Sequence, residues 1–167
     1  MSNNQTDPLP TYVISRHFNA PVETVWKAWT EPELITQWYG PNVDTIIHQF
    51  ELKPGGIWLN EMRMNTFSDR SRSVFMEVSP NKRLVWHQSS ADEDWNVTAN
   101  PMMPDWPTTV ATEVTFESDQ DQTDVSLVWS PYQASDAQIA CFAEAAANFG
   151  SGWEAGFTIM DDLLKSE

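Results

Sequence analysis

The sequence predicts a single α+β domain, in which a seven-stranded, mostly antiparallel sheet precedes one long helix. Three observations support this fold class. From Val43 to Trp129, successive runs alternate between apolar and polar residues, with no helical pattern between them. Two short runs with helical spacing come before Val43. A longer run, with apolar residues three and four positions apart, fills the C-terminal part of the chain.

The two short helices are expected directly after a first strand at Thr11–Phe18. Asn19 and Pro21 are typical of a helix start. The apolar residues that follow share one helical face: Val22, Val25, Trp26 and Trp29. A second short helix ends at Gly40-Pro41 and presents its own apolar side: Leu34, Ile35 and Trp38.

The strands after Val43 are separated by short turns, which is typical of hairpins. On the second strand, alternation predicts one shared face for Ile46, His48, Phe50 and Leu52. On the third, Trp58, Asn60, Met62 and Met64 share a face, and Ile57, Leu59, Glu61 and Arg63 share the opposite one. The remaining strands are expected at 72–78, 83–88, 110–116 and 123–129.

The C-terminal segment predicts one continuous helix of about seven turns. Ser135 followed by Gln138 forms a capping box at its start. One apolar stripe runs along it: Ile139, Phe142, Ala146, Phe149, Trp153, Phe157, Met160 and Leu164. Three glycines interrupt this pattern and predict close packing or a bend: Gly150, Gly152 and Gly156.

Composition narrows the possible partners. The chain of 167 residues carries 24 acidic and nine basic residues, for a net charge of −15. Such a charge opposes binding to nucleic acid or to an anionic membrane surface. Residues 1–10 are expected to be a disordered leader rather than a signal peptide, and residues 11–167 the domain. With one cysteine and no apolar run of membrane-spanning length, we expect a cytoplasmic protein.

No catalytic or metal-binding motif stands out. Cys141 lies between apolar neighbours on the predicted long helix, and no sequence feature places a histidine beside it, so we expect a structural role. The three histidines lack metal-ligand spacing, and no phosphate-binding glycine motif occurs. We therefore predict no metal, no cofactor and no catalytic residue.

Five fragments, in this order, carry a resemblance to a known family: FNAPVETVWKAWTEPELITQWYGP, LKPGGIW, EVSPNKRLVW, PTTVATEVTFE and the Gly152-Trp153 pair. They cover nearly the whole chain from residue 12. The chain resembles the activator of Hsp90 ATPase homologue 1-like domains of the START-like (SRPBCC) superfamily. The resemblance implies the helix-grip fold, in which the long helix lies in a concave sheet and leaves a hydrophobic cavity. Fold alone does not determine function.

The chain departs from this family in two places. Trp129 stands where the family often has a histidine, so a bulky ring replaces a polar group. Residues 91–108 form an apparent insertion that lengthens the connection before the sixth strand. Its apolar residues suit a lid over the cavity: Trp95, Met102, Met103 and Trp106. A fixed flap, or a contact with a second subunit in a homodimer, fits them equally well.

Strand alternation and the resemblance together predict a ligand site. Its expected residues are Trp38, Trp58, Asn60, Met62, Trp86, Gln88, Trp129, Phe149 and Trp153. Asn60 and Gln88 are expected to orient a ligand, with His48 as a weaker third group. The competing interpretation is that these rings simply fill the core.

Three functions remain open from the sequence. The first is non-enzymatic binding of a small hydrophobic or aromatic molecule. The second is an enzyme resembling the polyketide cyclases of the same superfamily, for which only His48, Glu61 or Glu77 offer acid–base groups. The third is a chaperone-interaction module, for which the resemblance supports the fold more than the partner.

Overall fold

The structure is a computed structural model that describes residues 9–41, 43–148 and 150–165. Its elements follow one another along the chain as β1 (Tyr12–Phe18), α1 (Val22–Thr30), α2 (Pro32–Trp38), β2 (Asp44–Phe50), β3 (Ile57–Arg63), β4 (Ser68–Ser79), β5 (Arg83–Ala91), β6 (Thr109–Asp119), β7 (Gln122–Pro131), α3 (Asp136–Ala145), the 3₁₀ turn η1 (Ala146–Asn148) and α4 (Gly150–Lys165). Most of the predicted leader lies outside the described residues.

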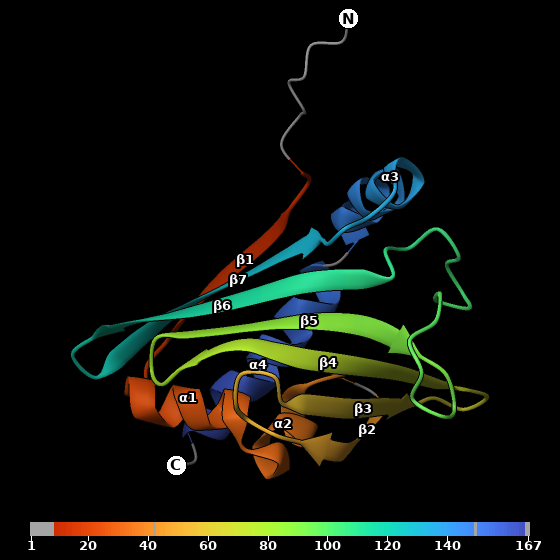
Figure 1. Ribbon diagram of the computed structural model, residues 1–167. Coiled ribbons are helices and arrows are strands. Elements are labelled where there is room, and N and C mark those ends of the chain that lie inside the picture. The colour runs from red at the N-terminus through yellow and green to blue at the C-terminus, as the bar shows by residue number, and fades with distance from the viewer. Residues whose placement is uncertain (1–8, 42, 149, 166–167) are drawn as a thin grey trace, which may run out of the picture.

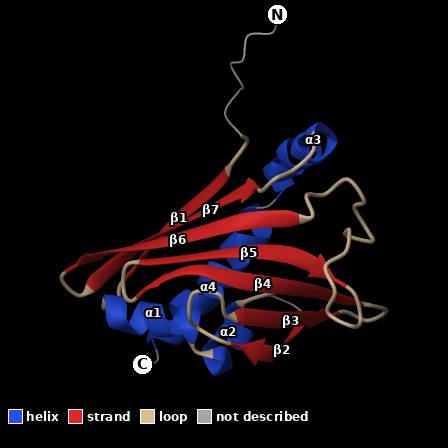
Figure 2. Ribbon diagram, in the orientation of Figure 1, coloured by secondary structure: helices blue, strands red, loops and turns tan. Residues whose placement is uncertain are grey.

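All seven strands form one antiparallel sheet in the order β1-β7-β6-β5-β4-β3-β2. Strands β2 to β7 follow one another as hairpin neighbours, and β1 closes the far edge beside β7, so the sheet is not closed into a barrel (Figures 1 and 2). The predicted fold class is confirmed: the sheet is antiparallel, and the C-terminal helix packs on one of its faces.

The core lies between the sheet and helices α1, α2 and α4, and it is rich in aromatic rings. Three of the four residues predicted for the buried face of α1 are buried, and Trp26 packs edge-on against Phe116 of β6. The indole nitrogen of Trp38 donates to the carbonyl of Ala28, 2.8 Å away, which fixes α2 against α1. The start of α1 differs slightly from expectation, since Pro21 takes the N-cap position and no side chain caps the helix.

The C-terminal segment is not one continuous helix, contrary to the prediction. The capping box of Ser135 and Gln138 is present at the start of α3. That helix ends at Ala145, the η1 turn follows, and α4 begins at Gly150. Figure 1 shows α3 projecting beyond the ends of β6 and β7, whereas α4 crosses behind the sheet. The predicted bend therefore lies before the first of the three glycines.

Strand β2 also differs from its predicted alternation. A register shift between Ile47 and Gln49 marks a β-bulge, in which His48 is the additional residue. The bulge reverses the phase of alternation. Ile47 and Phe50 pack against the core, while Ile46 pairs with Glu61 on the outer face. His48 therefore faces away from the helices, and the single face predicted for Ile46, His48, Phe50 and Leu52 is wrong.

Candidate functional site: two adjoining hollows beside helix α4

A hollow of about 290 Å³ lies between the start of α4, the end of α2 and the concave face of the sheet. We call it the inner hollow. Its walls come from helix and sheet alike: Trp38, Tyr39, Gly40, Pro41, Met62, Asp69, Gln88, Trp129, Gly152, Trp153 and Gly156. Aromatic rings dominate these walls, and Gln88 and Asp69 supply polar groups.

Helix α2 places two of the aromatic rings because of how it ends. Tyr39 is the C-cap residue, and Gly40 follows with φ +81°, a left-handed conformation that favours glycine. The hydroxyl of Thr45 donates to the Tyr39 carbonyl, 2.6 Å away, and so ties this turn to β2. The Tyr39 ring then packs against Trp58 and Trp153, with ring centroids 5.3 and 6.0 Å away.

Tyr39 and Asp69 set the electrostatics of the inner hollow. The Tyr39 side chain is buried, and burial raises its pKa above the ordinary value, with a further contribution from the negative charge of Asp69. Its hydroxyl donates to Gln88 Oε1 over 3.4 Å. The carboxyl of Asp69 remains accessible at the hollow, but the surrounding walls partly desolvate it and raise its pKa as well.

A second hollow, also of about 290 Å³, adjoins the first beneath the segment that connects β5 to β6. We call it the loop hollow. It shares Asp69, Gln88 and Trp129 with the inner hollow. Its other walls come from the sheet and the connecting segment: Arg70, Ser71, Ser90, Asn100, Met103, Trp106, Pro107, Thr108 and Val110.

The connecting segment, residues 92–108, is anchored on both sides of the sheet. Trp106 stacks on Phe142 of α3 with ring centroids 5.5 Å apart, and it lies 6.5 Å from the Trp129 ring. Trp95 instead lies on the outer face, 5.1 Å from the His48 ring and 6.0 Å from the Arg70 guanidinium. The segment thus wraps around the ends of β4 and β5.

The structure brings together five of the nine predicted ligand residues at the inner hollow: Trp38, Met62, Gln88, Trp129 and Trp153. Three others lie deeper and line neither hollow: Trp58, Asn60 and Trp86. Asn60 is only 3% exposed, and its Oδ1 forms no hydrogen bond to a described residue, so an orienting role for it does not fit this placement. Phe149 lies outside the described residues.

The predicted lid residues separate into two groups. Met103 and Trp106 line the loop hollow. Trp95 packs on the opposite face of the sheet, and Met102 is 69% exposed and lines neither hollow. A lid made of all four residues does not fit this placement, because the segment crosses from one face of the sheet to the other.

Sequence reasoning missed Tyr39 and Asp69. Tyr39 directly follows the last helical residue, where a helical wheel no longer indicates its direction. Asp69 lies in the part of β4 that extends beyond the strand predicted from residue 72. Its pairing with Met62 places it on the concave face, and a longer strand prediction with that register would have found it.

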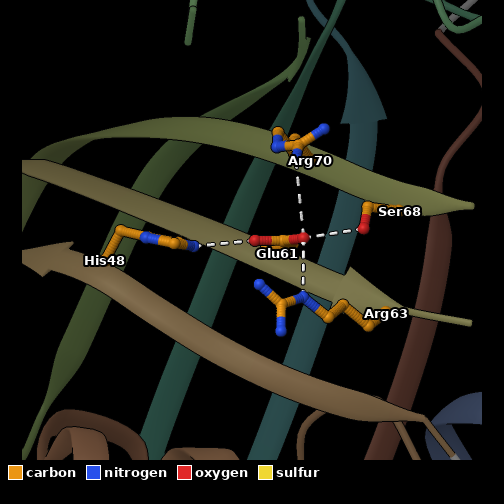
Figure 3. A network of polar contacts seen from close by, with 5 residues as sticks. All are labelled: His48, Glu61, Arg63, Ser68 and Arg70. Carbon is orange, nitrogen blue, oxygen red and sulfur yellow. Dashed lines mark hydrogen bonds and ion pairs between the residues drawn. The ribbon is translucent and has the colours of Figure 1, made fainter. Parts of the chain in front are cut away.

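The three acid–base candidates named from the sequence lie away from both hollows. Glu61 faces the outer side of the sheet, yet it is buried, with 2% of its surface exposed. Four side chains surround its carboxylate (Figure 3). His48 Nε2 lies 2.8 Å from Oε1, while the Ser68 hydroxyl donates to Oε2 over 2.6 Å and Arg63 Nε over 3.1 Å. The guanidinium of Arg70 forms an ion pair at 3.6 Å.

These partners stabilise the ionised form of Glu61. The hydrogen bond from Ser68 is the largest cause that lowers its pKa to about 2, with further contributions from His48 and Arg63, and burial opposes them. A buried carboxylate with its hydrogen bonds satisfied is typical of a structural ion cluster. Arg70 belongs both to this cluster and to the wall of the loop hollow.

Other candidate chemistry is weak in the described part of the chain. The described histidines, cysteine and acidic residues form no group of three that could hold a metal ion. Burial raises the pKa of the Cys141 thiol, with contributions from Asp105 and Glu144, and this disfavours the reactive thiolate. Of the helices within the described ranges, none is both long and apolar enough to cross a membrane.

Comparison with protein families gives one match that spans most of the chain. A family model described as "Activator of Hsp90 ATPase homolog 1-like protein" matches residues 19–165. The match includes every strand except β1, together with all the helices that line the hollows. A search of curated proteins gives no match.

Solved structures with the same fold come from several bacteria. A protein from Mycobacterium smegmatis aligns with a TM-score of 0.76 and 21% identity, covering 92% of this chain and 90% of its own. A protein from Arthrobacter aurescens aligns with a TM-score of 0.77 and 19% identity, covering 94% of this chain and 87% of its own. A protein from Nitrosomonas europaea aligns with a TM-score of 0.71 and 23% identity, covering 96% of this chain and 97% of its own. At these identities the likeness establishes the fold alone.

Proposed function

Because the chain belongs to the activator of Hsp90 ATPase homologue 1-like family, we propose that it acts as a binding domain for a small hydrophobic or aromatic molecule. The ligand would lie in the inner hollow, between α4 and the concave face of the sheet. This fold commonly binds hydrophobic ligands, and no catalytic step is part of the proposal.

The inner hollow is the observation that carries this proposal. Its apolar walls come from three different parts of the fold, with Trp38 from α2, Met62 from β3, and Trp153 from α4. A hollow of about 290 Å³ is at the lower end of the range for small-molecule sites. Gln88 and Asp69 provide the few polar groups that such sites use to orient a ligand.

Native mass spectrometry of freshly purified protein tests the proposal directly. We expect a mass excess over the bare chain that disappears when the same sample is denatured. If only the bare chain is found, isothermal titration with short phenyl-substituted alcohols and amines follows. Failure of every such probe to bind would contradict the proposal.

A variant that fills the inner hollow provides the matched test. Gly152 lines the hollow, and a Cβ atom added there meets nothing within 4 Å, so Gly152→Leu is expected to fold and to occupy part of the space. Ligand retention should fall at least about tenfold, because the ligand and the new side chain compete for one volume. Ala143→Leu, on the exposed surface of α3, adds a similar side chain away from both hollows and should retain the ligand.

One observation favours the alternative of an acid–base enzyme of the polyketide cyclase type. Asp69 lines both hollows, and partial burial raises its pKa, as is common for catalytic carboxyls. The same mass spectrum distinguishes the two functions. A binding domain releases its ligand unchanged after incubation, whereas an enzyme releases a product of different mass and loses this conversion in Asp69→Asn.

A further inference from the structure

The two hollows meet along a boundary made of Asp69, Gln88 and Trp129, which line both of them. These residues come from β4, β5 and β7, so the boundary crosses the concave face of the sheet. Because the hollows adjoin and have similar volumes, an elongated molecule can contact both at once.

The two hollows differ in chemistry. The inner hollow is lined mainly by apolar and aromatic side chains, including Trp38, Met62 and Trp153. The loop hollow has apolar walls too, but it also carries several hydroxyl and amide groups, from Ser71, Ser90, Asn100 and Thr108. Residues 92–108 contribute part of this lining, and they belong to the insertion predicted from the sequence. A molecule with one apolar end and one polar end therefore matches the two hollows together.

Charge at the boundary indicates which polar end fits. Among the described residues, Asp69 forms no ion pair, so a ligand can supply its partner. Gln88 Oε1 already accepts a hydrogen bond from Tyr39, which leaves the Gln88 amide N–H groups as donors. The guanidinium of Arg70, the cation of the loop hollow, is paired with Glu61 and lies over the Trp95 ring. An anionic end would thus meet Asp69 without a free cation to balance it.

We propose that the loop hollow is a second subsite of the ligand site, and that it receives the hydrogen-bond-donating end, an amine or a hydroxyl group, of an amphipathic ligand. The apolar or aromatic end lies in the inner hollow, and the donor contacts Asp69 at the boundary. This inference rests on the proposed function, because it assigns the class of molecule that the same site binds.

Three probes with a common phenylbutyl part test this assignment: 4-phenylbutylamine, 4-phenyl-1-butanol and 5-phenylpentanoate. Each carries the same phenyl ring and four-carbon chain, so only the terminal group differs. We expect isothermal titration to give the tightest binding for the ammonium, then the alcohol, with the carboxylate at least about tenfold weaker than the ammonium, since a charge-assisted hydrogen bond is replaced by repulsion.

Asp69→Asn isolates the carboxylate, since it keeps the size of the side chain and removes its charge. The preference for ammonium over carboxylate should shrink to less than about threefold. Asp105→Asn is the matched control. It makes the same change of net charge at an exposed residue of the connecting segment that lines neither hollow, and it should keep the preference of the unmodified protein.

Ser90→Leu tests the loop hollow itself, because Ser90 lines only that hollow. It should weaken binding of the amine about tenfold, whereas Ser118→Leu, at an exposed position on β6, should not. Equal binding of the three probes, or an unchanged preference in Asp69→Asn, would overturn this inference and leave the proposed function standing. If none of the probes binds and no native ligand is found, both fail.

Discussion

At the scale of single residues, Glu61 is the strongest test of the electrostatics. Its carboxylate is buried and accepts from Ser68, Arg63 and His48. We expect Glu61→Gln to lower the free energy of unfolding by about 2 kcal/mol, because charge-assisted hydrogen bonds are lost while the cations stay in place. Urea unfolding at pH 7 measures this change. Glu77→Gln is the control, at a half-exposed carboxylate paired with Arg83, and it should lower the free energy of unfolding much less than Glu61→Gln does.

The stability difference between the unmodified protein and Glu61→Gln should depend on pH, because folding lowers the pKa of Glu61. The pKa of Glu61 falls from an ordinary value of 4.5 to about 2 in the folded protein. Its contribution to stability is therefore fully present above pH 4.5 and is lost as the pH falls through 2. The stability difference between the unmodified protein and Glu61→Gln should shrink over this window. A difference that is constant from pH 6 to pH 3 would contradict the ion cluster.

His17 gives the opposite pH dependence. Its ring lies 2.7 Å from the Asp124 carboxylate, and that hydrogen bond raises the pKa of the imidazole above 6.5. Its contribution to stability is present below pH 6.5 and is lost as the pH rises through the folded value. NMR titration should find the pKa of His17 above that of His87, because burial lowers the pKa of His87. The substitution Asp124→Asn should lower the pKa of His17. An unchanged His17 titration in that variant would contradict the pairing.

Individual site residues were predictable where a strong pattern surrounds them. Met62, Gln88 and Trp129 lie on strands whose alternation is clear, and all three line the inner hollow. Asp69 has no such pattern, because β4 begins in a polar stretch where alternation carries no signal. The burial of Glu61 was also unpredictable, since its partners include His48 from a β-bulge and Ser68 and Arg70 from the polar start of β4.

At the scale of elements, two glycines of α4 make a matched pair. Gly156 lies against α2, and an added Cβ would come within 3.1 Å of the Trp38 carbonyl oxygen. At Gly152 the same atom meets nothing within 4 Å. Gly152→Ala should therefore raise the free energy of unfolding by about 0.5–1 kcal/mol through helix propensity. Gly156→Ala should lower it by about 1 kcal/mol, because the tight contact outweighs that gain. Equal effects in urea unfolding would contradict the close packing of α4 on α2.

Element boundaries were harder to predict than element types. The pattern of apolar residues continues from Ile139 to Leu164 without a break, yet the structure divides this segment at Ala146–Asn148. An uninterrupted apolar stripe fits two helices as well as one when both bury the same side. The bulge at His48 is similar, because a single additional residue leaves no mark on local composition.

At the scale of the whole molecule, a net charge of −15 implies self-repulsion in the folded state. We expect sodium chloride to raise the melting temperature by a few degrees between 0.01 and 0.5 M, because screening shortens the range of that repulsion. Asp121→Lys, in the exposed turn beside Asp119, should raise the melting temperature at low salt because it lowers the net negative charge. This gain should shrink as salt is added. A melting temperature that falls steadily with salt would show that attractive ion pairs dominate instead.

The overall topology was predictable because many weak signals agree. Seven alternating segments joined by short turns leave few arrangements other than an antiparallel sheet, and that sheet is present. The resemblance to the family, carried by five fragments in order, was confirmed by the family match over residues 19–165. The lining of the two hollows could not be predicted as a whole, since it combines side chains from seven elements and one long connection.

The packing of the tryptophans has an optical consequence. Eight aromatic rings form one unbroken series of neighbours, with the centroids of successive rings 4.6 to 6.5 Å apart. In order, they are Trp106, Trp129, Trp153, Tyr39, Trp58, Trp86, Trp29 and Trp38. At such separations excitation passes readily from one indole to the next, and paired transitions couple in circular dichroism. Emission from this protein therefore reports on the series rather than on any one ring. A molecule that quenches Trp153 would also darken indoles that it never touches.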